Sequence, residues 1–295
     1  MSDQSLGGIR LPEDSVGCRA THVGSTSASK SKRFDADFTC DHGLTAHQNE
    51  LAGVSLPLAS RAERKVQGAS SAHCTVHAVL GEGSGVRFQG ESHLEGNHLY
   101  LLNTKANIVD IQEQVRFYFG WESNKQEQHV FDAVATLDTS ERIAFAIKPE
   151  VRLSSGKFVA KIQAIAWWVY EKGFADEVRI LTEADLDPVD LYNAKVLAAV
   201  REFDPDGNAA AEAILAALPA GSGLSLRELT QATLMGARGY RALIRLLRTG
   251  AARLQKRERI GPQAVIVNAV ADHADRHLLD RPSLIAQALP YQTAA

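Results

Sequence analysis

Two apolar runs separated by four polar residues constrain this chain more than any other feature. Residues 129–137 read HVFDAVATL and residues 142–149 read RIAFAIKP, with DTSE between them. Runs of this length around a short turn predict an antiparallel strand pair. Because side chains alternate along a strand, Ala146 and Lys148 are expected on one face of the second strand. A tight hairpin would bring Asp132 opposite or nearly opposite Lys148.

The surrounding pattern predicts a small α/β core. A strand is expected at residues 74–80, before a flexible turn at 81–85. Residues 91–102 place Leu94, His98, Leu101 and Leu102 at helical spacing. Further elements are then expected as two short strands at 108–111 and 115–119, a helix at 156–173 that closes at Gly173, and a strand at 177–182.

From Asp185 onward, helix-forming residues dominate. Helices are expected at 189–203, 209–218 and 237–250, and the pair Ser225 and Glu228 has the spacing of a capping box. The segment 252–267 reads as two strands around a Gly261–Pro262 turn. Helices followed by such a hairpin predict a winged helix-turn-helix.

The composition bounds the molecule as a whole. Hydrophobic residues make up 45% and charged residues 23%, as in ordinary globular proteins. Three cysteines without metal-ligand spacing favour reduced thiols, and we find no signal segment and no apolar stretch of about 18 residues, so a cytoplasmic protein without a membrane span is expected. The expected organisation is a flexible segment 1–60, an α/β domain 61–184, a winged-helix-like domain 185–270 and a tail 271–295.

Basic residues concentrate in one stretch of a chain whose net charge is −3. Between Leu224 and Ile260 there are nine Lys or Arg and two acids. Candidate DNA-binding residues are Arg238, Arg241, Arg245, Arg248, Lys256 and Arg257, of which the first four recur at helical spacing. Contact with DNA phosphates is one interpretation. A solvated face, or a dock for an acidic protein, is the other, and the sequence favours neither.

The acids and the lysine of the α/β core suggest chemistry on phosphodiesters. The helix that contains Glu91 and Glu95 supplies a further acid to the predicted Asp132–Lys148 pair. Carboxylates are ligands for Mg²⁺, with Mn²⁺ as the alternative, and a lysine can orient water or neutralise developing charge. The structural alternatives are that Glu95 merely caps the helix with Ser92, and that Asp132 and Lys148 form an ordinary ion pair.

The order of these motifs resembles that of the PD-(D/E)xK nucleases, and more specifically the TnsA-type endonuclease subunit of heteromeric transposases. SHLEGNHLYLLNTKANIVDIQEQVRFYF resembles the start of that family's catalytic domain, and GFADEVRILTEADL resembles the segment that closes it. The resemblance covers roughly residues 60–270. It implies a restriction-endonuclease-like core with a winged-helix C-terminal domain. It also implies cleavage of transposon 5′ ends beside a DDE transposase and an AAA+ ATPase.

Carried over residue by residue, Glu95 and Asp132 match the metal-binding acids and Lys148 matches the catalytic lysine. The sequence departs from the family at Ala146, where Glu, Asp or Gln is expected. Gln114 or Glu150 could substitute for the missing ligand, the site could work without it, or the chain could be a cleavage-inactive relative that binds DNA or serves as a structural subunit.

Overall fold

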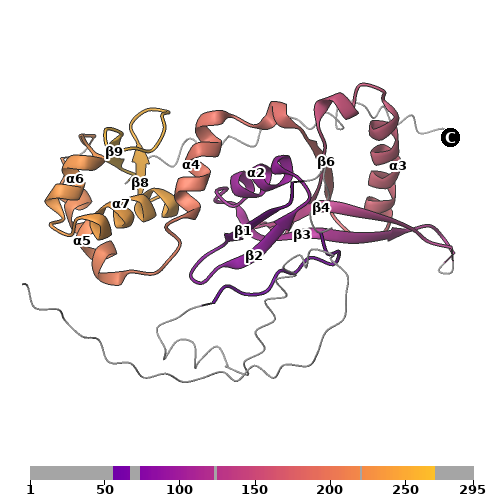
Figure 1. Ribbon diagram of the computed structural model, residues 1–295, viewed down its shortest axis with the longest axis horizontal. Helices are drawn as coiled ribbons and strands as arrows, with labels where there is room; N and C mark the ends of the chain where they lie inside the picture. The colour runs from indigo at the N-terminus through magenta and orange to yellow at the C-terminus, as the bar shows by residue number, and fades with distance from the viewer. Residues whose placement is uncertain (1–55, 67–73, 123–124, 220, 270–295) are drawn as a thin grey trace, which may run out of the picture. The chain divides into compact units, whose positions relative to one another are not determined.

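The computed structural model describes residues 56–66, 74–122, 125–219 and 221–269 (Figure 1). Most of the predicted N-terminal segment, residues 1–55, and the predicted tail 271–295 lie outside these residues. The described residues form a mixed α/β fold, as the sequence pattern predicts. A two-stranded sheet, a four-stranded mixed sheet and a three-stranded sheet are connected by helices.

The four-stranded sheet contains β3 (Ile108–Phe119), β4 (Glu127–Leu137), β5 (Arg142–Ile147) and β6 (Glu177–Leu181), in that order. Neighbours are antiparallel except for β5 and β6, which are parallel. The predicted hairpin is present, since the Leu137 N–H donates to the carbonyl of Glu141 and Thr136 pairs with Arg142.

The prediction of two short strands at 108–111 and 115–119 is wrong, because β3 is one strand of twelve residues. Gln114 has a positive φ of 52°, a conformation that interrupts the side-chain alternation without ending the pairing with β4. Ile111 and Val115 would share a face in a regular strand, yet they contribute to different core clusters. The irregularity therefore lies at the level of Gln114.

Helices pack on both faces of this sheet. α2 (His93–Leu102) contributes Leu99 and Leu102 to a cluster with Phe145 and Ile147, whereas α3 (Lys157–Glu171) contributes Ile162 and Ile165 to a cluster with Ala144 and Ala146. Successive residues of β5 thus enter opposite clusters, which confirms the predicted alternation of this strand. β1 (Val76–Leu80) and β2 (Val86–Gly90) form the two-stranded sheet beside α2.

Residues 56–66, which we call the N-terminal strap, lie along the outer edge of β3. The Glu63 N–H donates to the carbonyl of Gln114, and the Arg61 guanidinium pairs with Asp110. Ser60 donates to the buried carboxylate of Glu113. Contacts with the α/β core therefore begin before the domain boundary that the sequence suggests at residue 60.

The C-terminal elements are α4 (Pro188–Ala198), α5 (Pro205–Ala216), β7 (Gly223–Ser225), α6 (Leu226–Ala232), α7 (Ala237–Thr249), β8 (Ala252–Leu254) and β9 (Val265–Asn268). The three strands form a sheet in the order β7-β9-β8. The first predicted helix ends earlier than expected and the second begins earlier, because Asp204 caps α5 and Pro205 occupies its first position. The predicted capping box of Ser225 and Glu228 is confirmed at the start of α6.

A close approach between α2 and β1 fixes the helix that carries Glu95. A Cβ added to Gly96 would lie 2.6 Å from Cγ1 of Val76. We expect Gly96→Ala to lower the free energy of unfolding by about 1–3 kcal/mol, since the packed contact has no room for a methyl group. Urea unfolding measures the loss, and Asn97→Ala on the same helix is the control. Equal stability of the two variants would contradict this packing.

Candidate active site

Glu95 is held at the beginning of α2 by several donors. The Ser92 hydroxyl accepts a hydrogen bond from the Glu95 N–H and donates to Oε1 at 3.0 Å. Oε2 of Glu95 accepts from the Glu91 N–H at 2.8 Å and from the Gln114 side-chain amide at 3.2 Å. The side chain is only 5% exposed. Capping and a place in a buried polar site are therefore compatible roles of one carboxylate.

Asp132 lies where the pairing between β4 and β5 stops. The last paired residues are Ala133 and Phe145, and Oδ2 of Asp132 then accepts the Ile147 N–H at 2.7 Å. Nζ of Lys148 lies 3.4 Å from the same oxygen. The sequence prediction that Asp132 and Lys148 meet is therefore confirmed.

The carboxylates of Glu95 and Asp132 are close enough to affect each other's ionisation. Burial, and then the charge of Asp132, raise the pKa of Glu95 to about 7. Burial also raises the pKa of Asp132, although the ammonium of Lys148 opposes this shift. Two acids with raised pKa values and a lysine beside them form a cluster of the kind that active sites contain.

Gln114 and Arg64 complete one side of the cluster. Two N–H groups of Arg64 donate to Oε1 of Gln114, at 3.1 and 2.6 Å, and the guanidinium also pairs with Glu91 at 2.9 Å. The auxiliary candidate Gln114 is thus brought to the site. Sequence reasoning missed Arg64, because it belongs to the N-terminal strap and lies fifty residues before Gln114, in a segment without strand or helix periodicity.

His129 adds a second group that the sequence did not single out. Its ring packs edge-on against Phe131, with centroids 4.7 Å apart, and its Nε2 is buried without a partner among the described residues. Burial, together with the charges of Lys161, Lys148 and Arg64, lowers the pKa of His129 to about 4. Cations on α3, in the strap and at the residue that follows β5 therefore all act on His129.

Two other positions that the sequence singled out, Ala146 and Glu150, bring no polar side chain to the acids in the described part of the chain. Ala146 is 1% exposed and belongs to the apolar cluster under α3. Glu150 is exposed, and its N–H donates to the Glu183 carboxylate. No contact among the described residues connects the Glu150 carboxylate with Glu95, Asp132 or Lys148. Gln114 is therefore the auxiliary candidate that the structure brings together with the acids.

The donors present fit a single Mg²⁺ better than a closed metal cage. No group of three or more His, Cys, Asp or Glu side chains in the described residues is arranged to hold a metal. Mg²⁺ is commonly held by one or two carboxylates, with water and substrate phosphate as the other ligands. Burial and the charge of Asp132 both disfavour a negative charge on Glu95, and a bound cation would oppose both effects. Glu95 and Asp132 therefore suit this mode of binding.

The arginines of the predicted DNA-binding stripe are bound within the chain. Arg238 and Arg245 pair with Asp204 at 2.7 and 3.3 Å, and Arg241 pairs with Glu202. Arg248 binds Glu82 and also donates to the carbonyls of Gly81 and Leu197. DNA contact at this stripe stays a prediction, and it would require these arginines to exchange partners.

Lys256 and Arg257 lie beyond the stripe, between β8 and β9. Lys256 pairs with Glu258 at 3.4 Å, and Arg257 pairs with Asp187 and Asp190 at 2.7 and 3.0 Å. Both side chains remain largely exposed. The side chains of Lys256 and Arg257 are therefore accessible to DNA, whereas those of Arg245 and Arg248 are largely buried.

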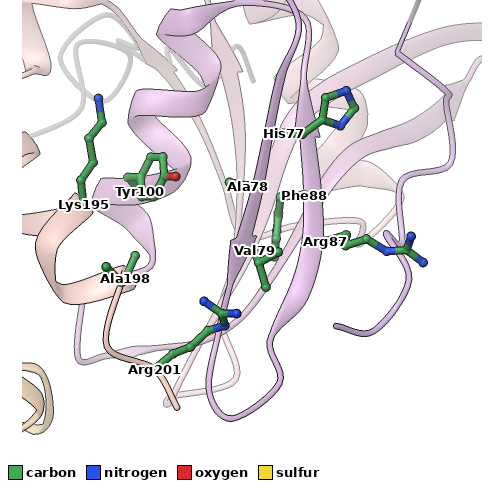
Figure 2. A pocket seen from close by; sticks show the side chains of 10 residues that line it. His77, Ala78, Val79, Arg87, Phe88, Tyr100, Lys195, Ala198 and Arg201 are labelled. Atoms are coloured by element: carbon green, nitrogen blue, oxygen red, sulfur yellow. The ribbon is translucent and has the colours of Figure 1, made fainter. Parts of the chain in front are cut away.

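A cavity of about 420 Å³ lies away from the acids. Figure 2 shows its lining, which includes Tyr100, Lys195 and Arg201. The ammonium of Lys195 lies over the Tyr100 ring at 5.8 Å. None of Glu95, Asp132 and Lys148 lines this cavity, so it is separate from the candidate active site.

The sequence matches no model of a protein family, and a search of curated proteins gives no significant match. None of the helices in the described residues has the length and apolar character needed to cross a membrane.

The raised pKa of Glu95 predicts a pH-dependent stability. A carboxyl whose pKa rises from 4.5 to about 7 on folding favours the folded state below pH 4.5, and this contribution is lost as the pH rises to about 7. The loss is on the order of 3 kcal/mol. Glu95→Gln mimics the protonated acid, so we expect it to raise the melting temperature at pH 8 and to leave it nearly unchanged at pH 4.

The matched control is Glu141→Gln, which changes an exposed acid at the β4–β5 turn. Thermal unfolding across this pH range measures both variants against the parent chain. A stabilisation by Glu95→Gln that is the same at pH 4 and pH 8 would contradict the raised pKa.

Proposed function

We propose that this protein is a metal-dependent DNA endonuclease subunit of a transposase complex, of the TnsA type. The observation that carries the proposal is the meeting of Glu95 on α2, Asp132 on β4 and Lys148 just after β5, where two buried carboxylates lie beside a half-buried ammonium. These are the residues that match the family motif one by one. Their juxtaposition is what cleavage of a phosphodiester requires.

The order of elements supports the same proposal. α2 precedes β3, β4 and β5, and α3 then leads to a parallel β6, which is the helix–three strands–helix–strand order expected of a PD-(D/E)xK core. In the C-terminal region, α5, β7, α6, α7 and the β8–β9 pair follow in the order of a winged helix. By the same resemblance, the partners would be DNA, a DDE transposase and an AAA+ ATPase.

Each residue of the site has a distinct role in this proposal. The Lys148 ammonium, now 3.4 Å from Asp132, would neutralise the charge that develops on the phosphate. Gln114 and the Glu91 N–H hold one oxygen of Glu95 and so fix the direction of its carboxylate. With a pKa of about 7, Glu95 can accept a proton at neutral pH in the absence of a cation.

Glu95 and Asp132 would hold the metal, for which Mg²⁺ is the natural ion and Mn²⁺ the alternative. When bound, such an ion supplies polarisation of the phosphate and a lower pKa of the attacking water. The burial of both carboxylates would strengthen their attraction for the cation, because few water molecules screen it.

A cleavage-inactive DNA-binding or structural subunit is the alternative function. The observation that favours it is the environment of residue 146, where the family expects an oxygen ligand and this chain places a methyl group in an apolar cluster. The Asp132–Lys148 pair would then serve only to fix β4 against β5.

Replacement of the site residues tests the proposed cleavage. We expect Asp132→Asn and Lys148→Met each to reduce Mg²⁺-dependent nicking of supercoiled plasmid at least about 100-fold, since both groups act at the scissile phosphate. Asp138→Asn and Lys105→Met are the controls at positions outside the site. Failure of the parent chain to nick in Mg²⁺ or Mn²⁺, alone and with its partner subunits, would favour the inactive alternative.

Ala146→Glu tests whether position 146 can hold a metal ligand. A carboxylate in the apolar cluster under α3 should lower the free energy of unfolding by about 2–5 kcal/mol. Ala213→Glu, on the exposed side of α5, should change it little. Thermal unfolding in EDTA and in Mg²⁺ gives the comparison. Selective stabilisation of Ala146→Glu by Mg²⁺ would show that the carboxylate reaches a metal and would contradict the apolar assignment.

A further inference from the structure

All three tryptophans of the chain gather at one end of the central sheet. The rings of Trp121, Trp167 and Trp168 contact one another edge to face, with centroids 4.8–6.1 Å apart. Trp121 follows β3, and the other two belong to α3. This helix lies beside the end of β3 and the start of β4 (Figure 1). We call these three residues the tryptophan cluster.

The tryptophan cluster is only partly covered by the rest of the chain. Trp121 is 78% exposed and Trp167 is 41% exposed, and the neighbouring Tyr170 is also largely exposed. Burial of large aromatic side chains is a major source of stability, so their exposure on one surface indicates a binding face. This surface has no part in holding Glu95 or Asp132.

The solvent face of α3 is basic as well as aromatic. Three exposed lysines recur at intervals that place them on one side of α3 and its C-terminal end: Lys157, Lys161 and Lys172. The one acid of α3 is Glu171. The Lys172 ammonium lies over the Trp168 ring at 5.8 Å. Among the described residues, none of these three lysines forms an ion pair with an acid. They differ in this respect from the arginines of α7.

β4 connects the candidate active site with the tryptophan cluster. His129 lies on this strand, three residues before Asp132, and the charges of Lys161 and Lys148 both lower its pKa. Along β4, Asp132 and Glu127 are five residues apart, or about 17 Å, and Glu127 pairs with Phe119 next to the tryptophan cluster. This span corresponds to about five nucleotides of a DNA strand.

We infer that the tryptophan cluster and the lysines of α3 bind the DNA that flanks the cleavage site. The inference rests on the proposed nuclease function and extends it to a surface outside the active site. Lys157, Lys161 and Lys172 contact phosphates, and Trp121 packs against a base or sugar of the flanking DNA. Free cations together with exposed aromatic rings favour nucleic acid over a protein partner as the occupant.

Intrinsic fluorescence gives a direct test, because every tryptophan of the chain belongs to the cluster. The full chain is titrated in EDTA with a dye-labelled DNA duplex that ends in a single-stranded extension, so that binding is measured without cleavage and unpaired bases are available for stacking. Tryptophan emission should change in parallel with the anisotropy of the dye. Trp121→Ala should weaken binding about 5- to 150-fold, the range that corresponds to one stacked base. Phe203→Ala, which removes another exposed aromatic ring, should not.

The lysines are tested through the salt dependence of the same binding. Lys161→Gln should reduce the slope of log K against log salt by about 0.9, the value for one phosphate contact. DNA binding that leaves the emission unchanged and is equal in the parent and Trp121→Ala would overturn the inference. If the parent chain binds DNA in a Trp121-dependent way but does not nick plasmid, the proposed cleavage is overturned and the inferred binding surface stands.

Discussion

The burial of two carboxylates, those of Glu95 and Asp132, is the constraint on which the rest of the site depends. Neither acid is tolerated there without partners, since burial of a charge is costly unless hydrogen bonds or an opposite charge compensate for it. Lys148, the Ile147 N–H and the Gln114 amide each supply part of that compensation. The irregular backbone of β3 at Gln114 and the end of the β4–β5 ladder both occur at this site.

Some features of the fold and site follow from the sequence because they depend on local periodicity. The short turn after β4 fixes the register of the hairpin, and the alternation of β5 then places Lys148 beside Asp132. The N-cap of Ser92 and the capping box of Ser225 are likewise local patterns. Such features need only a few neighbouring residues, and single-sequence reasoning can reach them.

Other features could not be predicted because their partners are distant in the chain. Arg64 meets Gln114 across fifty residues, and Arg248 meets Glu82 across 166. The helical spacing of the α7 arginines correctly predicts that they share a face, but it contains no information about the acids that lie against them. The sequence around Gln114 predicts a break between two strands, whereas β3 continues through this residue. A positive φ at a non-glycine residue leaves no clear signal in the sequence, so the irregular strand could not be distinguished from two separate strands.

The N-terminal strap also affects how the molecule behaves toward its own copies. An uncovered outer strand presents unpaired N–H and C=O groups, which are a template for pairing with another chain. The strap covers part of this edge, since Glu63 bonds to the Gln114 carbonyl and Arg61 bonds to the carbonyl of Ile111. A truncated chain that begins after residue 66 would therefore be prone to aggregation through β3, even with every acid and lysine of the site intact.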